Sequence, residues 1–157
     1  MAKKTEALKE RLQAYTESRR DYEMQIERLQ RMAAASQYKS PSFEPMSGGG
    51  SPSKDKIADA ICELIELENQ LKDDKDALDE ERRQIDALIR KMKKADERAI
   101  IRMKYFDGMG WTDIAHAIYH REEDFKQAVS AYQQKAYKLH GAALLSLAKI
   151  YNKNENT

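Results

Sequence analysis

The sequence predicts an all-α protein, in which a long antiparallel helical hairpin of coiled-coil type is followed by a small helical domain. Apolar residues recur at three- and four-residue spacing along most of the chain, and no segment shows the period-two alternation of a strand. Charged residues make up 35% of the 157 residues, against roughly 25% in typical soluble domains. Such a composition favours long solvated helices with at most one small core.

The chain divides into four predicted segments. Residues 1–35 form an N-terminal coiled-coil helix, residues 36–53 a flexible Ser/Pro/Gly linker, residues 54–96 a long second coiled-coil helix, and residues 97–157 the C-terminal domain. All three prolines and three of the six glycines lie between Ser40 and Ser53. A linker of this composition can reverse the chain direction and join two long helices.

Both long helices carry a heptad seam. In the first, the seam residues are Leu8, Leu12, Tyr15, Tyr22, Ile26, Leu29 and Ala33, with a break at Arg19. In the second, they are Ile57, Ile61, Leu64, Leu71, Leu78, Ile85, Ile89 and Met92, with breaks at Glu68, Lys75 and Arg82. A helix with so narrow an apolar stripe needs a partner. The first helix can fold back onto the second, and the unpaired remainder of the second can associate with another subunit, which predicts a homo-oligomer. Whether the hairpin pairs within one subunit or between two stays open.

The C-terminal domain begins with two helical stretches separated by a glycine turn. Gly108 suits the left-handed position that closes a helix, and Gly110 can cap the next helix with Asp113 in its first turn. The expected core residues are Ile100, Ile101, Met103, Tyr105, Phe106, Trp111, Ile114, Ala115 and Ile118. A last long helix should pack one face on this core through Phe125, Val129, Tyr132, Ala136, Leu139, Ala143, Leu144, Leu147 and Ile150.

The last helix is wholly cationic over thirty residues. Residues 125–154 contain five lysines and no Asp or Glu. The residues able to reach base edges and phosphates are Gln133, Gln134, Lys135, Tyr137, Lys138 and His140. The alternative interpretation is a solvated face of a structural helix.

Four segments of the sequence are similar to segments of known protein families. They are the N-terminal helix, the linker with Asp55-Lys56-Ile57-Ala58-Asp59-Ala60 after it, the run Tyr105-Phe106-Asp107-Gly108-Met109-Gly110-Trp111-Thr112-Asp113-Ile114-Ala115, and the run Tyr137-Lys138-Leu139-His140-Gly141-Ala142-Ala143-Leu144. The second half resembles the helix-turn-helix of region 4 of sigma-70 factors. The whole chain resembles the ArpU-like or RinA-like late transcriptional regulators of phages and integrated elements of Gram-positive bacteria.

This resemblance implies a helix from Trp111 to about Tyr119 that supports a recognition helix in the major groove of double-stranded DNA. The groove-facing residues would be Gln133, Gln134, Lys135, Tyr137 and Lys138, with His140 near a phosphate. The stretch between Tyr119 and Tyr137 is longer than the usual turn. Either the recognition helix is extended backwards or an extra turn has been inserted.

Catalytic, metal and cofactor sites are not predicted. His116 and His120 stand at i,i+4 but lack a third ligand, so we interpret them as surface residues. No hydroxyl lies in a nucleophile-elbow context, and Cys62 is expected to be a small buried apolar residue. The chain has neither an apolar run long enough for a bilayer nor the N-terminal pattern of a signal peptide, so a cytoplasmic protein without membrane contact is expected.

Three functional hypotheses follow. The first is a sequence-specific DNA-binding transcriptional regulator of a phage or mobile element, whose long helices dimerise or contact host RNA polymerase. The second is a coiled-coil adaptor that binds another protein. The third is a DNA-packaging protein of small-terminase type. The sequence identifies neither the operator nor the sign of regulation.

Overall fold

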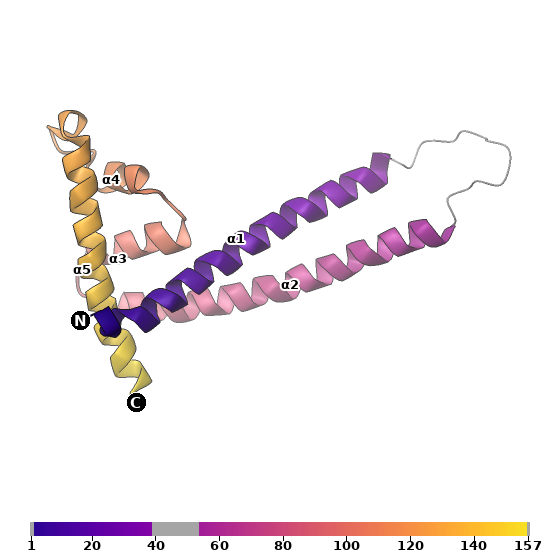
Figure 1. Cartoon of the computed structure of the whole chain (residues 1–157), viewed down its shortest axis with the longest axis horizontal. Helices are drawn as coiled ribbons and strands as arrows, with labels where there is room; N and C mark the ends of the chain where they lie inside the picture. The colour runs from indigo at the N-terminus through magenta and orange to yellow at the C-terminus, as the bar shows by residue number, and fades with distance from the viewer. Residues whose placement is uncertain (1, 39–53, 157) are drawn as a thin grey trace. The chain divides into compact units, whose positions relative to one another are not determined.

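The computed structural model describes residues 2–38 and 54–156 (Figure 1). Its elements are α1 (Ala2–Tyr38), α2 (Lys54–Arg90), α3 (Ala95–Ile101), the π-helix η1 (Arg102–Phe106), α4 (Trp111–Tyr119), the 3-10 turn η2 (Phe125–Gln127) and α5 (Val129–Glu155). These ranges contain no strand, so the all-α prediction is confirmed. Most of the predicted linker, residues 39–53, lies outside the described residues.

The chain forms two compact units, and each contains parts of both long helices. Unit 1 comprises Met1–Glu17 and Glu80–Thr157, and unit 2 comprises Ser18–Asp79. Unit 1 therefore combines the two ends of the predicted hairpin with all the C-terminal helices. Within the described ranges, no helix combines the length and the apolar character that a bilayer span requires.

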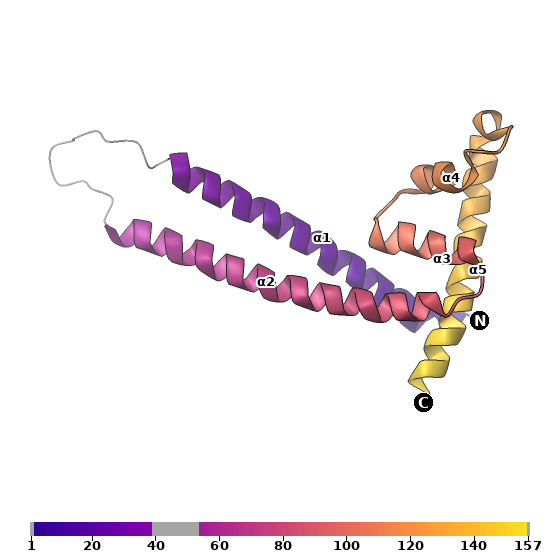
Figure 2. The same ribbon diagram turned by 180° about the vertical axis from the view of Figure 1, so that it is seen from behind.

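Unit 2 consists of the remaining lengths of α1 and α2, which run antiparallel (Figures 1 and 2). The seam is most tightly packed at Leu71, which is only 3% exposed. The other seam residues in contact are half-buried: Tyr22, Ile26, Leu29 and Ala33 on α1, with Leu64 and Leu78 on α2. The heptad spacing thus identified the packed row correctly from Leu64 onward.

Two seam residues and the cysteine depart from their predicted environments. Ile57 and Ile61 are 55% and 49% exposed, and Cys62 is exposed as well. The prediction that Cys62 is buried was therefore wrong. Ile57 lies within about 20° of Leu64 around the helix and Ile61 about 60° from it, so their exposure shows that this end of α2 is left uncovered.

Unit 1 has one apolar core to which α1, α2, α3, η1, α4 and α5 contribute. Its buried apolar side chains are Leu8, Leu12 and Tyr15 of α1, Ile85, Leu88 and Ile89 of α2, Met92 between α2 and α3, Ile100 and Ile101 of α3, Tyr105 and Phe106 of η1, Ile114 and Ala115 of α4, and Tyr132, Ala136, Ala143, Leu144, Leu147 and Ala148 of α5. Helix α5 packs against both α3 and α4. Of the predicted core residues, Met103, Trp111 and Ile118 are only half-buried.

Charged side chains join α1 and η1 to α2 at the edge of this core. Arg11 Nε donates to Glu81 at 2.6 Å, and Arg102 Nε donates to Asp86 at 2.9 Å. Arg82, a predicted break in the seam, places its guanidinium 4.8 Å from the centre of the Phe106 ring. The break therefore serves a cation–π contact with η1 rather than a seam contact.

The turn before α4 is built from η1 and two glycines. The amide of Asp107 donates to the Arg102 carbonyl and that of Met109 to the Met103 carbonyl, both at 3.0 Å. Gly108 has φ of 64°, and Gly110 caps α4 with extended backbone, as predicted for both glycines. Because Gly108 is the only described residue in the left-handed region, the turn depends on it.

Replacing Gly108 with Ala should lower the free energy of unfolding by about 1 kcal/mol, because an L side chain at positive φ is strained. The matched control is Gly141→Ala in the middle of α5, where an added Cβ meets no atom within 4 Å. That change should raise stability by about 0.5–1 kcal/mol through helix propensity. Urea unfolding of the two variants measures both effects; equal changes would contradict the role assigned to Gly108.

Candidate nucleic-acid interface

Helix α4 lies against the first half of α5, and side chains in the first turn of α4 join it to α5. Gln133 Nε2 donates to Thr112 Oγ1 at 3.1 Å. The Trp111 ring packs edge-on against Tyr137, with ring centres 5.2 Å apart. At the other end of α4, the rings of Tyr119 and Tyr132 lie 5.2 Å apart. These contacts fix the direction of α5 relative to α4.

The segment between the two helices is ordered around Tyr132. Its hydroxyl donates to Asp124, and this hydrogen bond, with burial, raises the pKa of Tyr132 to about 12. The Phe125 ring lies 5.6 Å from Tyr132 and 5.7 Å from His116. The segment contains the extra turn η2, and α5 begins at Val129, eight residues before Tyr137. The stretch therefore contains an inserted turn, and the helix that carries Tyr137 is also extended backwards.

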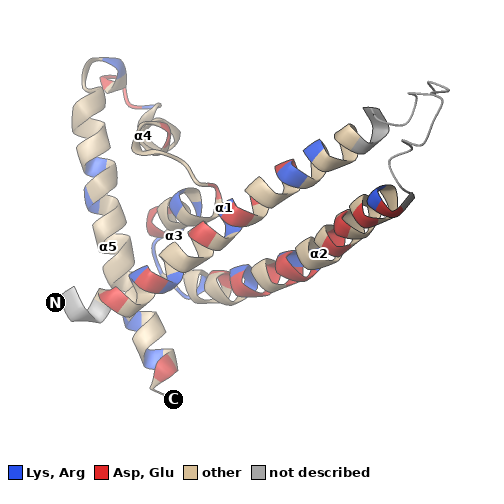
Figure 3. Cartoon of the chain, turned by 45° about the vertical axis from the view of Figure 1, so that its right-hand side comes forward, with Lys and Arg blue, Asp and Glu red and all other residues tan. Residues whose placement is uncertain are grey.

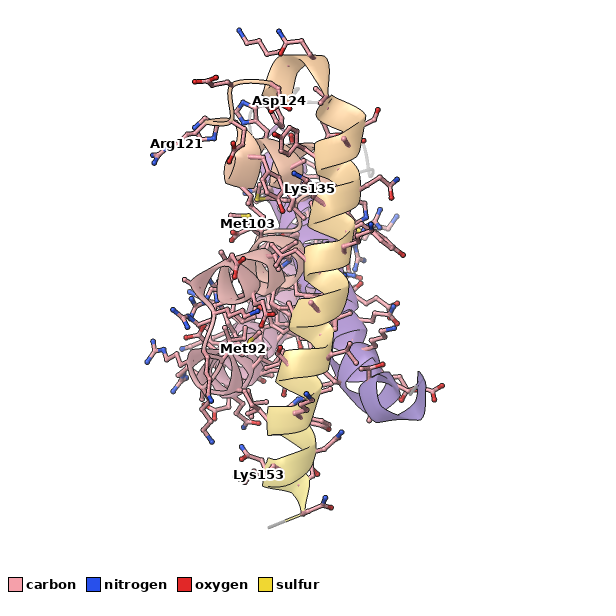
Figure 4. The ribbon with its side chains drawn as sticks, turned by 90° about the vertical axis from the view of Figure 1, so that its left-hand side faces the viewer. Met92, Met103, Arg121, Asp124, Lys135 and Lys153 are labelled. Atoms are coloured by element: carbon pink, nitrogen blue, oxygen red, sulfur yellow. The ribbon has the colours of Figure 1, made fainter. Side chains whose placement is uncertain are left out.

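The predicted contact residues divide into an exposed set and a packed set. Gln134, Lys135 and Lys138 are exposed, and Tyr137 is 61% exposed. Lys135 Nζ lies 4.7 Å from the centre of the Tyr132 ring (Figure 4). Gln133 is half-buried through its bond to Thr112.

His140 belongs to the packed set. The Tyr105 hydroxyl lies 3.0 Å from His140 Nε2, where it can donate to the neutral ring. The Trp111 ring packs edge-on against the same imidazole at 5.1 Å. Burial, followed by the charges of Lys104 and Lys9, lowers the pKa of His140 to about 4. His140 is thus neutral at pH 7 and ties α5 to η1.

This shift predicts a pH dependence of stability. The pKa of His140 falls from 6.5 in the unfolded chain to about 4 in the folded one. Between these values the unfolded chain binds more protons, so stability is fully present above pH 6.5 and decreases as the pH falls. The loss by pH 4 should be about 1–2 kcal/mol, discounted for solvent screening of a partly exposed ring.

Replacing His140 with Gln, which keeps an acceptor for Tyr105, should remove this part of the pH profile. His116→Gln, at an exposed position of α4, should leave it intact. Urea unfolding between pH 4 and pH 7 distinguishes the two, and an unchanged profile in His140→Gln would refute the assignment.

Sequence reasoning missed Lys104. Its ammonium lies 4.8 Å from the centre of the Trp111 ring, so it joins the surface formed by Trp111 and Tyr137. Lys104 lies in the π-helix η1, and the apolar periodicity gave no signal for a π-helix. Sequence reasoning also passed over Ser130 and Ala131, which are exposed in the first turn of α5. Their position in the first turn is evident only once α5 is known to begin at Val129.

Charge is distributed unevenly over the helices. The acidic side chains crowd the part of α2 in unit 2, whereas α5 shows only basic bands until Glu155 (Figure 3). The exposed half of α5 from Ser130 to Lys138 thus combines amides, a tyrosine and two cations without an opposing carboxylate. Such a surface can bind a polyanion and can hydrogen-bond to base edges.

The structure shows no set of metal ligands in the residues that it describes. They contain no group of three or more His, Cys, Asp or Glu placed to hold an ion. The His116 and His120 rings stack at 5.2 Å, and His120 Nδ1 contacts the His116 carbonyl at 2.9 Å. The two histidines therefore contact each other at the end of α4.

The chain belongs to a family described as a protein of unknown function (DUF1492), which matches residues 37–134. This match covers more than half of the 157 residues. It includes the glycine turn, the whole of α4 and the start of α5 through Gln134. No curated protein and no solved structure matches the chain.

Proposed function

We propose that the protein is a sequence-specific double-stranded DNA-binding regulator of transcription, in which α4 and α5 act as a helix-turn-helix. One observation carries this proposal. The N-terminal half of α5 is fixed by α4, yet its outer face is exposed, free of acidic side chains and rich in groups that contact DNA. Helix-turn-helix proteins place such a helix in the major groove, with its N-terminal residues on the base edges.

In this proposal, the outermost row of exposed residues on α5 contacts the DNA bases. Ala131, Gln134 and Lys138 follow one another at steps of three and four residues and are all exposed. A glutamine can bond bidentately to adenine and a lysine can bond to guanine, while Ala131 can contact a thymine methyl group. Ser130 can contact either a base or a phosphate.

The lysines on either side of this row contact the DNA phosphates. Lys135 lies over Tyr132, and Lys104 lies over Trp111. Stacking on a ring restricts an otherwise flexible ammonium, so less entropy is lost when it pairs with a phosphate. The first turn of α4 adds free backbone N–H groups, because Gly110 caps it without a side-chain bond.

Gln133, Tyr137 and His140 have different roles in this arrangement. Gln133 positions α5 through Thr112, and His140 does so through Tyr105. As a neutral ring, His140 supplies no charge to a phosphate. Tyr137, exposed but held at its edge by Trp111, can contact the sugar-phosphate backbone beside the groove.

The resemblance to ArpU-like and RinA-like proteins gives this function its setting, which is control of late genes in a phage or mobile element within a bacterial cytoplasm. Host RNA polymerase is the natural second partner of such a regulator. The function needs no catalytic group, metal or cofactor, because recognition by hydrogen bonding and charge is sufficient.

Selection of sites from a random duplex pool tests the proposal, with affinities then measured at two salt concentrations. A regulator should select one sequence and bind it at least about 1,000-fold more tightly than random duplex, with affinity for both falling as salt rises. Weak, equal binding to all duplexes, in an assembly of eight or more subunits, would favour DNA packaging. No binding at low salt would favour a protein-binding adaptor.

A further inference from the structure

The lysines of α5 all lie on one face of the helix. They are Lys135, Lys138, Lys149 and Lys153, and each of them is exposed. At about 100° per residue, Lys135 and Lys153 are about five full turns apart, and the other two lie within about 60° of them. The four ammonium groups therefore form a row about 27 Å long, and Figure 4 labels its two ends. We refer to it as the lysine row.

No carboxylate interrupts the lysine row. The only acidic side chain of α5 is Glu155, which stands about 160° around the helix from Lys153. Along the middle of the row, the same face carries Ala142 and Leu145, which are exposed and uncharged. The row thus begins within the proposed recognition surface and continues beyond it for about four turns of the helix.

The turn between α2 and α3 adds cations at the C-terminal end of the lysine row. Residues 90–94 read Arg-Lys-Met-Lys-Lys, and their four basic side chains are exposed. Lys91 Nζ donates to Asn154 Oδ1 at 3.4 Å. Lys91 and Lys153 also line one pocket of about 350 Å³, together with Ile150 and Asn154. The basic turn and the end of α5 therefore lie side by side.

The core of unit 1 holds this turn in place. Its central residue, Met92, is buried, and Arg98 Nη1 donates to the Met92 carbonyl at 2.6 Å. Arg90 pairs with Asp86, but the ion pairs of the described residues include none of the three lysines of the turn. Cations held close together without a carboxylate repel one another, and a bound anion removes this repulsion.

A nucleic-acid backbone matches these cations better than an acidic protein segment does. The lysine row is continuous with the surface of α5 that the proposed function places against DNA, and a partner that contacts its whole length must carry regularly spaced charges. In homeodomains, the C-terminal end of the recognition helix contacts the DNA backbone. From Gln134 to Lys153, α5 rises by about 29 Å, which corresponds to at most roughly nine base pairs along a duplex.

We propose that residues 90–94, Lys149 and Lys153 form a flank-binding surface, which contacts the phosphates of the duplex outside the site that the first half of α5 reads. This inference rests on the proposed function and extends it. Phosphate contacts carry no sequence information. The flank-binding surface therefore raises affinity without changing the discrimination between base pairs.

Two duplexes test this proposal with the full chain. One ends about two base pairs beyond the selected site, and the other continues for about ten base pairs of random sequence on each side. The chain should bind the longer duplex about tenfold more tightly at physiological salt, because it neutralises more phosphates. Lys91→Glu with Lys149→Glu should remove this gain, yet change the affinity for the shorter duplex less than about threefold.

The matched control is Lys72→Glu with Lys75→Glu, which makes the same charge change at exposed positions of unit 2. It should keep the tenfold gain. Far-UV circular dichroism checks that both double variants keep their helices. Since all four substituted side chains are exposed, both variants should fold.

The possible outcomes separate this inference from the proposed function. Equal affinity of the full chain for the two duplexes would overturn the flank contact and leave base reading by α5 intact. A gain that survives Lys91→Glu with Lys149→Glu, or that is lost equally in the control, would overturn it as well. A chain that selects no sequence would overturn the proposed function, and this inference with it.

Discussion

Replacing Lys135 and Lys138 together with Glu should weaken binding to the selected DNA by at least about 100-fold at physiological salt. Both side chains are exposed on the part of α5 that the proposal places against DNA. The double change removes two positive charges and sets two carboxylates against the phosphates, so it removes counterion release and adds repulsion. The salt dependence of the residual binding should fall by about one phosphate contact, that of Lys135. Fluorescence anisotropy over a salt series measures both quantities.

The matched control for this variant is Lys72→Glu with Lys75→Glu on α2. It has the same charge change, the same three-residue spacing and the same exposure, but it lies on α2 in unit 2, whereas the proposal places α4 and α5 against the DNA. It should alter affinity less than about threefold, through net charge alone. Equal losses in the two double variants would mean that total charge rather than the α5 surface governs binding.

Replacing Leu147 with Ala should lower the stability of unit 1 by about 3 kcal/mol. Leu147 is 0% exposed in the core, and removal of three buried carbons leaves a cavity as well as a transfer loss. Fluorescence of Trp111, the only tryptophan and a residue of unit 1, follows this unit's unfolding in urea. The loss is large relative to the stability of a typical domain.

Leu145→Ala is the control on the same helix, two residues earlier. Leu145 is 45% exposed, so its truncation opens no cavity and should change stability by less than about 0.5 kcal/mol. A similar loss in both variants would show that α5 does not bury the face that contains Leu147.

Local signals predicted most of the fold. The glycine turn predicted where α4 begins, because Gly108 and Gly110 define where one helix ends and the next begins, whereas the end of α4 near Tyr119 was what the resemblance implied. The π-helix η1 was not predictable, since its i to i+5 bonds depend on tertiary packing of Tyr105 and Phe106. The outward position of Ile57 and Ile61 was missed because heptad spacing identifies a stripe without stating how far a partner covers it.

The candidate site was predictable in part. The absence of acids and the choice of Gln134, Lys135 and Lys138 came from composition, and all three are exposed. Composition could not show that His140 is held by Tyr105, because that contact joins residues 35 apart in the chain. The same holds for Lys104, whose place beside Trp111 depends on the geometry of η1 and the glycine turn.

The measurement that tests the central claim most directly is the binding of Gln134→Ala to a set of duplexes, each changed at one base pair of the selected site. Gln134 lies exposed in the outermost row of α5, so its loss should erase about 1–3 kcal/mol of discrimination at one base pair and leave the others intact. Lys135→Ala should weaken binding to every duplex alike. A uniform loss in Gln134→Ala, or unchanged discrimination at every position, would contradict base reading by α5.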